Sequence, residues 1–313
     1  MVCVSANCNK SDVHAVLQIS RNIELIRLGL KNTLMLVLMQ IDYSYIVAAA
    51  ELIADADSLV ITSGAGIGID SGLPDFRGEN GFWKAYPALG NLGINFTQIA
   101  NPRAFQQHPE LAWGFYGHRL QLYRDTVPHE GFRRLLELAK QMPLGLRHFT
   151  SNVDGQFQKA GFKPEHVTQC HGSIHMLQYM DQCGQEAWPA DDFQPIVDVA
   201  NCKLISPLPS CPVCGGLARP NILMFGDWDF EGHRYAQSES NLLTWFARAS
   251  RPVVIEIGAG TAIPSARHFG EELNCPLIRI NPSESQVGLH RDISIPLGAK
   301  EALIRITDAL KSG

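Results

Sequence analysis

The chain has no excess of basic residues, no long apolar run and no dense set of cysteines. Its 26 lysines and arginines are outnumbered by 31 aspartates and glutamates, which gives a net charge of −5. This balance argues against a broad nucleic-acid surface, although a local basic groove is compatible with it. The 313 residues are enough for one large core, or for one core with a smaller module beside it.

The most apolar part of the N-terminal region lies between Leu25 and Val47. Three charged residues interrupt it: Arg27, Lys31 and Asp42. Its longest unbroken apolar run, Leu34 to Met39, is far below the ~20 residues that a membrane span needs, and no signal-peptide cleavage site follows promptly. We therefore expect no membrane association. Residues 1–44 are interpreted as an N-terminal extension, helical or disordered, ahead of a folded domain of residues 45–313.

The eight cysteines are scattered, and only Cys211 and Cys214 have C-x-x-C spacing. A secreted disulfide framework would be denser and its chain shorter. We therefore expect a cytoplasmic protein whose thiols are reduced or bound to a metal.

Short apolar runs alternate with helical patterns over most of the sequence. The expected strands are Leu59–Thr62, Leu146–Thr150, Val253–Ile257, Leu277–Ile280 and Ile293–Ile295. This alternation predicts an α/β fold, a Rossmann-like parallel sheet with helices on both faces. Two insertions, at about residues 80–130 and 173–225, are expected to form a smaller domain with a helical part and a cysteine-bearing part like a zinc ribbon.

Polar or glycine-rich clusters follow these strands, and in open α/β sheets ligands bind at that edge. The most informative cluster is Gly64 to Gly78, GAGIGIDSGLPDFRG. Glycines directly after a strand let backbone amides approach a pyrophosphate, because no Cβ is in the way. The ordinary dinucleotide fingerprint does not fit, since Ile69 occupies the place of the third glycine.

As a whole, this segment resembles the cofactor-binding loop of the sirtuin family of NAD-dependent protein deacylases, in its bacterial form. Gly68 stands where many members carry serine. The resemblance extends from Tyr45 to Leu310, with the motifs in family order. It implies that NAD is a co-substrate, bound by residues of this loop: Gly64, Ala65, Gly66, Ile67, Asp75, Phe76 and Arg77.

Two further strand ends resemble NAD-binding motifs of the family. TSNVDG, which ends at Gly155, resembles TQNIDG with Ser151 in the place of glutamine, and this implies that Asn152 and Asp154 hold the ribose and the nicotinamide carboxamide. A simple Asx turn is the alternative. The loop after Ile257 resembles a GTS loop with Ala262 in the place of serine. The implied contacts on this side are Gly258, Gly260, Thr261 and Asn281, the last with the adenosine ribose.

His171, in the run Gln-Cys-His-Gly-Ser, resembles the catalytic histidine of the family. The implied reaction releases nicotinamide first; His171 then takes a proton from a ribose hydroxyl, and O-acyl-ADP-ribose and free lysine result. Imidazole suits this step because its ordinary pKa lies near neutrality. Asn152 is expected to assist it, and His175 is the main rival for the role of base.

Two segments are candidates for contact with an acylated peptide. RPNILMFGD, which begins at Arg219, resembles the substrate strand of the family, to which a peptide adds as a further strand. The implied contacts are Leu223, Phe225 and Gly226, and an ordinary core strand is the alternative.

Tyr116 and Arg119 match a Tyr-x-x-Arg pattern that favours malonyl or succinyl lysine in some sirtuins. A hydroxyl and a guanidinium together can bind a carboxylate. The alternative is a helix face on which Tyr116 is buried and Arg119 is in solvent.

The zinc-ribbon pattern is incomplete. Members of the family carry a second cysteine pair shortly after the histidine, but this region contains only Cys183, and Tyr179 replaces an expected partner. Cys202 or a histidine is the candidate fourth ligand. We expect zinc with the ligand set Cys183, Cys202, Cys211 and Cys214; a decayed site held together by packing is the alternative.

Together these motifs predict an NAD-dependent protein lysine deacylase, a transferase that moves acyl groups to ADP-ribose. Its expected partners are acylated lysine side chains of proteins, with acetyl, malonyl and succinyl groups as candidates, and no nucleic acid. An NAD glycohydrolase or ADP-ribosyltransferase on the same fold is the alternative, prompted by Ser151 and the incomplete cysteine set. An NAD-sensing module without activity is a third hypothesis, and the presence of His171 argues against it.

Overall fold

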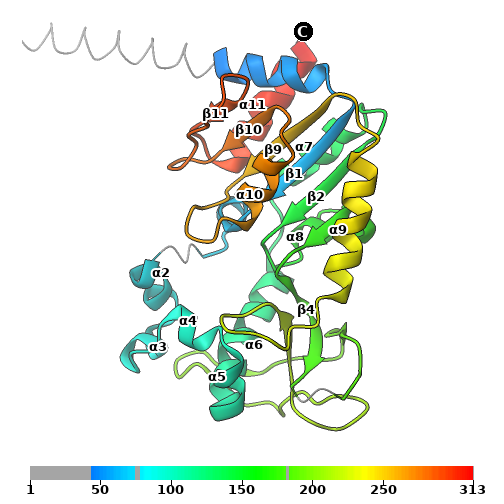
Figure 1. Cartoon of the computed structure of the whole chain (residues 1–313). Coiled ribbons are helices and arrows are strands. Elements are labelled where there is room, and N and C mark those ends of the chain that lie inside the picture. Colours follow the sequence, from blue (N-terminus) through cyan, green and yellow to red (C-terminus); the bar gives the residue numbers. More distant parts are fainter. Residues whose placement is uncertain (1–43, 75–77, 181–182, 313) are drawn as a thin grey trace, which may run out of the picture.

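The computed structural model describes residues 44–74, 78–180 and 183–312 (Figure 1). The N-terminal extension up to residue 43 lies outside the described residues, as do Asp75, Phe76 and Arg77. Within the described ranges, no helix is long and apolar enough to span a membrane.

The core of the fold is a sheet of six parallel strands in the order β11-β10-β9-β1-β2-β3. The strands are β1 (Ser58–Ser63), β2 (Leu146–Thr150), β3 (Val167–Gln169), β9 (Pro252–Ile257), β10 (Leu277–Ile280) and β11 (Ile293–Ile295). This arrangement confirms the predicted Rossmann-like α/β fold. The strand order reverses between β1 and β9, and such a switch point is where α/β proteins bind ligands.

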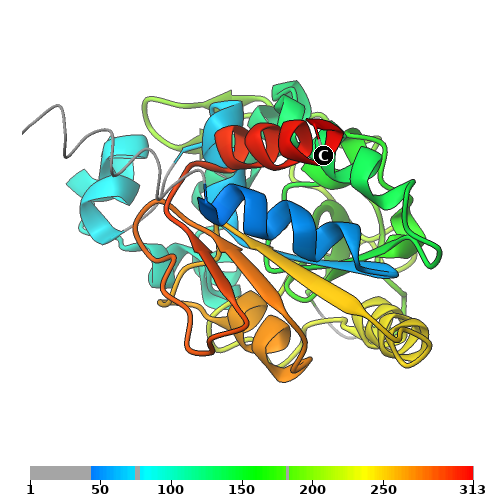
Figure 2. The ribbon, with the colours of Figure 1, turned by 90° about the horizontal axis from the view of Figure 1, so that it is seen from above.

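Helices cover both faces of the sheet, as Figure 2 shows from above. The helix of residues 44–54, α7 (Glu130–Ala139), the short α8 (Gln156–Lys159) and α11 (Ala299–Ser312) pack against the face that includes Leu59 and Ile61. On the opposite face, α9 (His233–Phe246) and α10 (Ser265–Glu272) pack against Val60 and its neighbours. Successive residues of β1 therefore point to opposite cores, which is why this strand is buried throughout and its centre, Leu59 to Ile61, is apolar.

A smaller unit with its own core lies below the carboxyl edge of the sheet in Figure 1. Its helices are α2 (Gly78–Ala85), α3 (Pro87–Asn91), α4 (Phe96–Ile99), α5 (Pro102–Gln107) and α6 (Pro109–Asp125). Its antiparallel strands are β4 (Gly172–Tyr179), β5 (Trp188–Pro189) and β8 (Ala218–Ile222), with a separate pair, β6 (Val197–Asp198) and β7 (Lys203–Leu204). The indole of Trp113 on α6 donates to the carbonyl of Ala218 (2.9 Å) and so joins the helical and sheet parts.

The chain passes from the large sheet into the small one at a single histidine. β3 ends at Gln169 and β4 begins at Gly172, so His171 lies at the junction of the two units. Gly172 has a φ of +75°, and a Cβ at this position would lie 2.1 Å from the carbonyl oxygen of Asn221. Glycine is therefore required directly after His171.

Candidate active site

Two glycine-bearing loops meet at the carboxyl edge of the sheet. Gly64 follows β1 and begins the 3₁₀-helix η1 (Ala65–Ser71), while Gly258 follows β9 with a φ of +60°. The N–H of Gly66 donates to the carbonyl of Gly258 (3.0 Å), and a Cβ on Gly66 would lie 2.7 Å from Gly258 Cα. The glycines thus serve first to bring two backbones into contact at the switch point.

The amides of these glycines are already engaged. Gly64 N–H donates to Ile257 (3.1 Å), as Gly66 N–H does to Gly258, whereas Ala65 between them is exposed at the surface of the loop. The sequence argument assigned these glycines to pyrophosphate approach; the structure adds a packing reason for their presence.

Asn152 is fixed against the first glycine loop. Its side-chain Nδ2 donates to the carbonyl of Gly64 (3.1 Å), and its backbone N–H donates to Thr150 Oγ1 (3.0 Å). The residue is 8% exposed, so its side-chain amide is largely shielded from solvent. Both contacts predefine the orientation of the carboxamide.

Asp154, two residues after Asn152, is also buried. Burial raises the pKa of its carboxyl to about 6, although a hydrogen bond from the backbone of Gln156 and the charge of Arg119 counteract this rise. Its Oδ1 accepts the N–H of Gln156 (2.9 Å), which is an Asx-type contact. Asp154 therefore both closes a turn through its Oδ1 and carries a carboxyl group with a pKa near neutrality.

His171 contacts residues from both sides of the switch point. Its Nε2 lies 3.2 Å from Ser265 Oγ at the start of α10, and its ring also hydrogen-bonds the backbone of Ser151. Burial lowers the pKa of the imidazole, while the Ser151 contact raises it in part. The ring is accordingly neutral at pH 7 and able to accept a proton. Its own carbonyl accepts the N–H of Leu223 (3.0 Å).

The rival histidine, His175, has a different setting. Its Nε2 hydrogen-bonds the carbonyl of Asp154 (2.9 Å). A Cβ on Gly155, whose φ is +70°, would lie 2.7 Å from the same ring. His175 therefore supports the loop that carries Asn152 and Asp154 from below, and His171 is the better candidate for the base.

The loops after β9 and β10 are joined by a carboxylate that sequence reasoning missed. Glu284 Oε2 accepts the N–H of Thr261 (2.9 Å), and Oε1 accepts its hydroxyl (3.2 Å). Asn281 Nδ2 donates to the carbonyl of Ala259 (3.0 Å), and Gly260 is exposed between these contacts. The position of Glu284 just past the end of β10 was the available signal.

The segment after β8 leaves the core at Leu223. β8 itself is buried throughout, whereas Leu223 and Phe225 are 41% and 38% exposed, so the core-strand interpretation fits only residues 218–222. Phe225 N–H donates to the carbonyl of Ala100 (2.9 Å), and Gly226 has a φ of +64°. Apolar side chains are thus presented to solvent next to His171.

Trp228 was also missed from sequence, and its side chain is 96% exposed. It lines a pocket of about 410 Å³ together with Gly226 and residues of α5 and its N-cap: Asn101, Pro102, Arg103 and Gln106, with Asp229. This pocket adjoins the exposed segment from Leu223 to Gly226. An exposed indole beside a pocket is a typical contact for a bound chain.

Tyr116 and Arg119 are both buried on α6, at 1% and 8% exposure. The alternative interpretation is therefore wrong in placing Arg119 in solvent and right in burying Tyr116. Its guanidinium donates to the hydroxyl of Tyr123 through Nε (3.0 Å) and Nη2 (2.5 Å), and it lies 5.2 Å from the ring centre of Phe115. Burial raises the pKa of Tyr116 to about 12. The surrounding aromatic rings account for the burial of this cation.

Three of the four candidate metal ligands come together. The thiols of Cys183, Cys211 and Cys214 lie within 4.8 Å of one another, with 3.6 Å between the Sγ atoms of Cys183 and Cys211. Cys202 is not part of this group; it is 2% exposed in the core of the smaller unit. These three thiols therefore fit three of the four ligand positions that zinc prefers to fill, often with thiolates.

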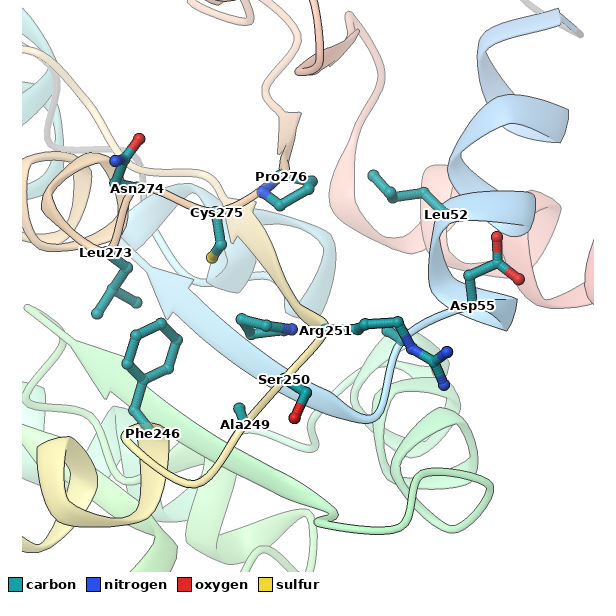
Figure 3. A pocket seen from close by; sticks show the side chains of 12 residues that line it. Leu52, Asp55, Phe246, Ala249, Ser250, Arg251, Leu273, Asn274, Cys275 and Pro276 are labelled. Carbon is teal, nitrogen blue, oxygen red and sulfur yellow. The ribbon is translucent and has the colours of Figure 1, made fainter.

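A second pocket, of about 520 Å³, lies at the opposite edge of the sheet (Figure 3). Pro252 and Pro276, at the amino ends of β9 and β10, line it together with Leu52, Phe246 and Cys275. None of the predicted site residues borders it. The volume of a cavity is therefore a poor guide to the chemistry of this protein.

Comparison with known proteins settles the family. The sequence model of the Sir2 family matches residues 64–241, a span that includes the loops after β1 and β2, His171, the cysteine group and β8. The chain belongs to the Sir2 family. This confirms the sirtuin resemblance predicted from the sequence.

Relatives of this Sir2 chain include two NAD-dependent protein deacylases. The protein of Aquifex aeolicus is 28% identical over 259 residues, 81% of this chain and 95% of the relative. That of Thermococcus kodakarensis is 30% identical over 267 residues, 84% and 95% of the two chains. A solved structure of a mutant Sir2 homologue in complex with ADP-ribose is 26% identical, with a TM-score of 0.63 over 84% of this chain and 95% of the other.

Proposed function

We propose that this Sir2 chain is an NAD-dependent protein lysine deacylase. The relatives named above are NAD-dependent protein deacylases, and the solved homologue binds ADP-ribose. The observation that carries the proposal is the position of His171. Its ring contacts Ser151 and Ser265, one on each side of the switch point, and its carbonyl binds Leu223.

In this proposal one dinucleotide extends along the carboxyl edge of the sheet. Asn152, Asp154 and His171 lie on the β2 side, where the nicotinamide end is bound and cleaved. The loop of Gly258, Gly260 and Thr261, with Asn281, lies on the β9 and β10 side and holds the adenosine end. Ala65 and Ile67, of the loop after β1, complete the binding set, and contacts from Asp75, Phe76 and Arg77 stay a prediction of the sequence.

Residues of the chain have separate roles in the proposed reaction. Bound NAD supplies a ribose carbon that becomes electrophilic as nicotinamide leaves. Asn152, held by Gly64 and Thr150, orients the nicotinamide end. His171, neutral at pH 7, accepts the proton of a ribose hydroxyl at its imidazole. The segment from Leu223 to Gly226 binds the acylated peptide as an added strand.

Zinc has a structural place in this scheme. Cys183, which follows the end of β4, and Cys211 and Cys214, which precede the start of β8, would hold it. Bound zinc supplies a fixed geometry to this part of the small unit and takes no part in the reaction. The cytoplasmic location and the lack of a nucleic-acid partner stay predictions of the sequence.

The proposal is tested by nicotinamide release from NAD, with and without an acetyl-lysine peptide. A deacylase releases nicotinamide and deacetylates the peptide in equal amounts, and it releases little without peptide. Release that is independent of peptide would instead support the NAD glycohydrolase alternative. Labelling of proteins with ADP-ribose would support the transferase alternative.

Acyl preference can be tested at Arg119. If Arg119 and Tyr116 bind a terminal carboxylate, Arg119→Met lowers kcat/KM for succinyl peptide by at least about 10-fold, because a charge-assisted hydrogen bond contributes about 1.5–3 kcal/mol. Acetyl peptide turnover should change by less than about threefold. Steady-state assays on acetyl, malonyl and succinyl peptides measure this, and an equal loss for all three would remove the carboxylate-binding role.

Trp228 should contact residues that flank the acylated lysine. We expect Trp228→Ala to raise the KM for a peptide about 5- to 10-fold and to leave the KM for NAD unchanged, because the side chain is exposed and its removal leaves the core intact. Leu289→Ala, another exposed apolar side chain, is the matched control. An unchanged peptide KM would show that the pocket beside Gly226 is not used.

A further inference from the structure

One buried histidine, His148, has no role in the reaction scheme above. His148, on β2, has 0% exposure, and its ring packs on Phe157 with 3.6 Å between ring centres. Its Nε2 lies 2.8 Å from Ser63 Oγ, while Nδ1 is buried with no hydrogen-bond partner among the described residues. Burial lowers the pKa of His148 to about 3, so the ring is neutral at physiological pH.

From this ring a chain of short hydrogen bonds leads to Asn152. Ser63 Oγ lies 2.8 Å from Thr150 Oγ1, and Thr150 Oγ1 accepts the backbone N–H of Asn152 (3.0 Å). Ser63 also precedes Gly64, whose carbonyl accepts the side-chain N–H of Asn152 (3.1 Å). One contact that orients Asn152 is therefore made by a member of this series of bonds, Thr150, and the other by the residue that follows Ser63.

The direction of the protons follows from counting donors. Thr150 has one hydroxyl proton, and its Oγ1 is placed to donate to the carbonyl of Ser63 (3.2 Å). It then accepts from the Ser63 hydroxyl, which in turn must accept from His148 Nε2–H. If His148 instead carried its proton on Nδ1 and accepted from the Ser63 hydroxyl at Nε2, one hydrogen bond fewer would form. Nδ1–H would then be a buried donor without an acceptor, which is rarer in proteins than an unpaired acceptor. The favoured tautomer thus carries its proton on Nε2.

We propose that His148 is a positioning residue, which fixes the hydroxyls of Ser63 and Thr150 and through them the carboxamide of Asn152. The inference rests on the proposed function, because its effect on turnover requires that Asn152 orient the nicotinamide end. Without a donor at position 148, the Ser63 hydroxyl can rotate and its oxygen is left buried with one partner fewer. Asn152 then loses the fixed acceptor of its backbone N–H.

The kinetic test compares His148→Val, His148→Gln and Ser63→Ala with the wild type. Valine suits a buried strand but donates no hydrogen bond, and we expect kcat to fall about 10-fold, as for loss of one neutral hydrogen bond. The KM for peptide should stay within about twofold, because the segment from Leu223 to Gly226 is not part of this series of hydrogen bonds. Glutamine can donate from a position near Nε2 and should restore most of the rate.

Coupling gives a second readout. The double variant His148→Val with Ser63→Ala should be no slower than the slower single variant, because both remove the same link. Leu138→Ala, a buried change on α7 at a residue that makes none of these hydrogen bonds, controls for general loss of stability and should leave kcat unchanged in the folded protein. Urea midpoints of all variants show that each is folded under assay conditions.

Nitrogen NMR of the wild type is independent of activity. We expect the His148 ring to show a protonated Nε2 and an unprotonated Nδ1 at pH 7. A proton on Nδ1, wild-type kcat in His148→Val, or additive losses in the double variant would each overturn the proposal. If the wild type releases no nicotinamide with acyl peptide, the proposed function fails, while the NMR result still decides the hydrogen-bond chain.

Discussion

His171→Ala is expected to lower kcat for acyl-peptide turnover by about 10³-fold, the typical contribution of a positioned general base. The affinity for NAD should change little, because the removed imidazole acts on a proton and supplies no phosphate contact. Stopped assays of deacylated peptide and calorimetry with NAD measure the two effects. His290→Ala, at an exposed position, is the matched control. Full activity of His171→Ala would assign the base elsewhere, with His175 the next residue to test.

The pH profile gives the same step a second test. Burial lowers the pKa of His171 below its ordinary 6.5, and only the neutral ring accepts a proton. The rate should therefore persist down to pH 6.5 and fall only at lower pH. Asp154, with a pKa near 6, titrates in a similar window, so Asp154→Asn is needed to separate the two acid limbs. A limb centred above pH 7 would contradict the neutral-base assignment.

The second large effect is expected at the contact of the two glycine loops. A Cβ on Gly258 would lie 2.4 Å from Ile67 N and 2.5 Å from Gly66 C, and its φ of +60° disfavours any other residue. Gly258→Ala should cost about 2–4 kcal/mol of the free energy of unfolding, in line with strain at a special backbone position. It should also abolish measurable NAD binding, because the loops cannot close on each other.

Gly288→Ala is the control for this prediction. A Cβ at Gly288 would meet no atom within 4 Å, so the substitution should leave both stability and NAD binding unchanged. Urea denaturation and calorimetry on the two variants measure the difference. If Gly258→Ala binds NAD like the wild type, the contact between the loops has no part in forming the cleft.

The sheet could be predicted because its strands are continuous apolar runs with helical patterns between them. β1 and β9 are buried on both faces, so their sequences carry no alternation and stand out. β3, with the sequence VTQ, was missed since it contains a single apolar residue, unlike the equally short β11 with the sequence ISI. The strand order and the switch point are properties of pairing, and the sequence alone does not show them.

The site was predictable only where residues follow strands directly. Asn152 and Asn281 fall in that class, whereas His171 was identified from its motif alone because the strand before it, β3, was missed. Glu284 and His148 act through hydrogen bonds that depend on the relative placement of two strands. Only the position of Glu284 just past the end of β10 was a signal in the sequence, and His148 had none. Arg119 was misjudged because helix periodicity does not reveal that aromatic rings from neighbouring turns enclose it. Cys202 was grouped by residue type, although the fold buries it in another core.

The place of the larger pocket has a practical consequence for inhibitor discovery. A screen that docks compounds into the pocket of about 520 Å³ would select the region of Cys275, at the amino ends of β9 and β10. The glycine loops begin about 20 Å away, one strand length farther along β9. Hits from such a screen should leave nucleotide consumption untouched, and competition with NAD is the criterion that would expose them early.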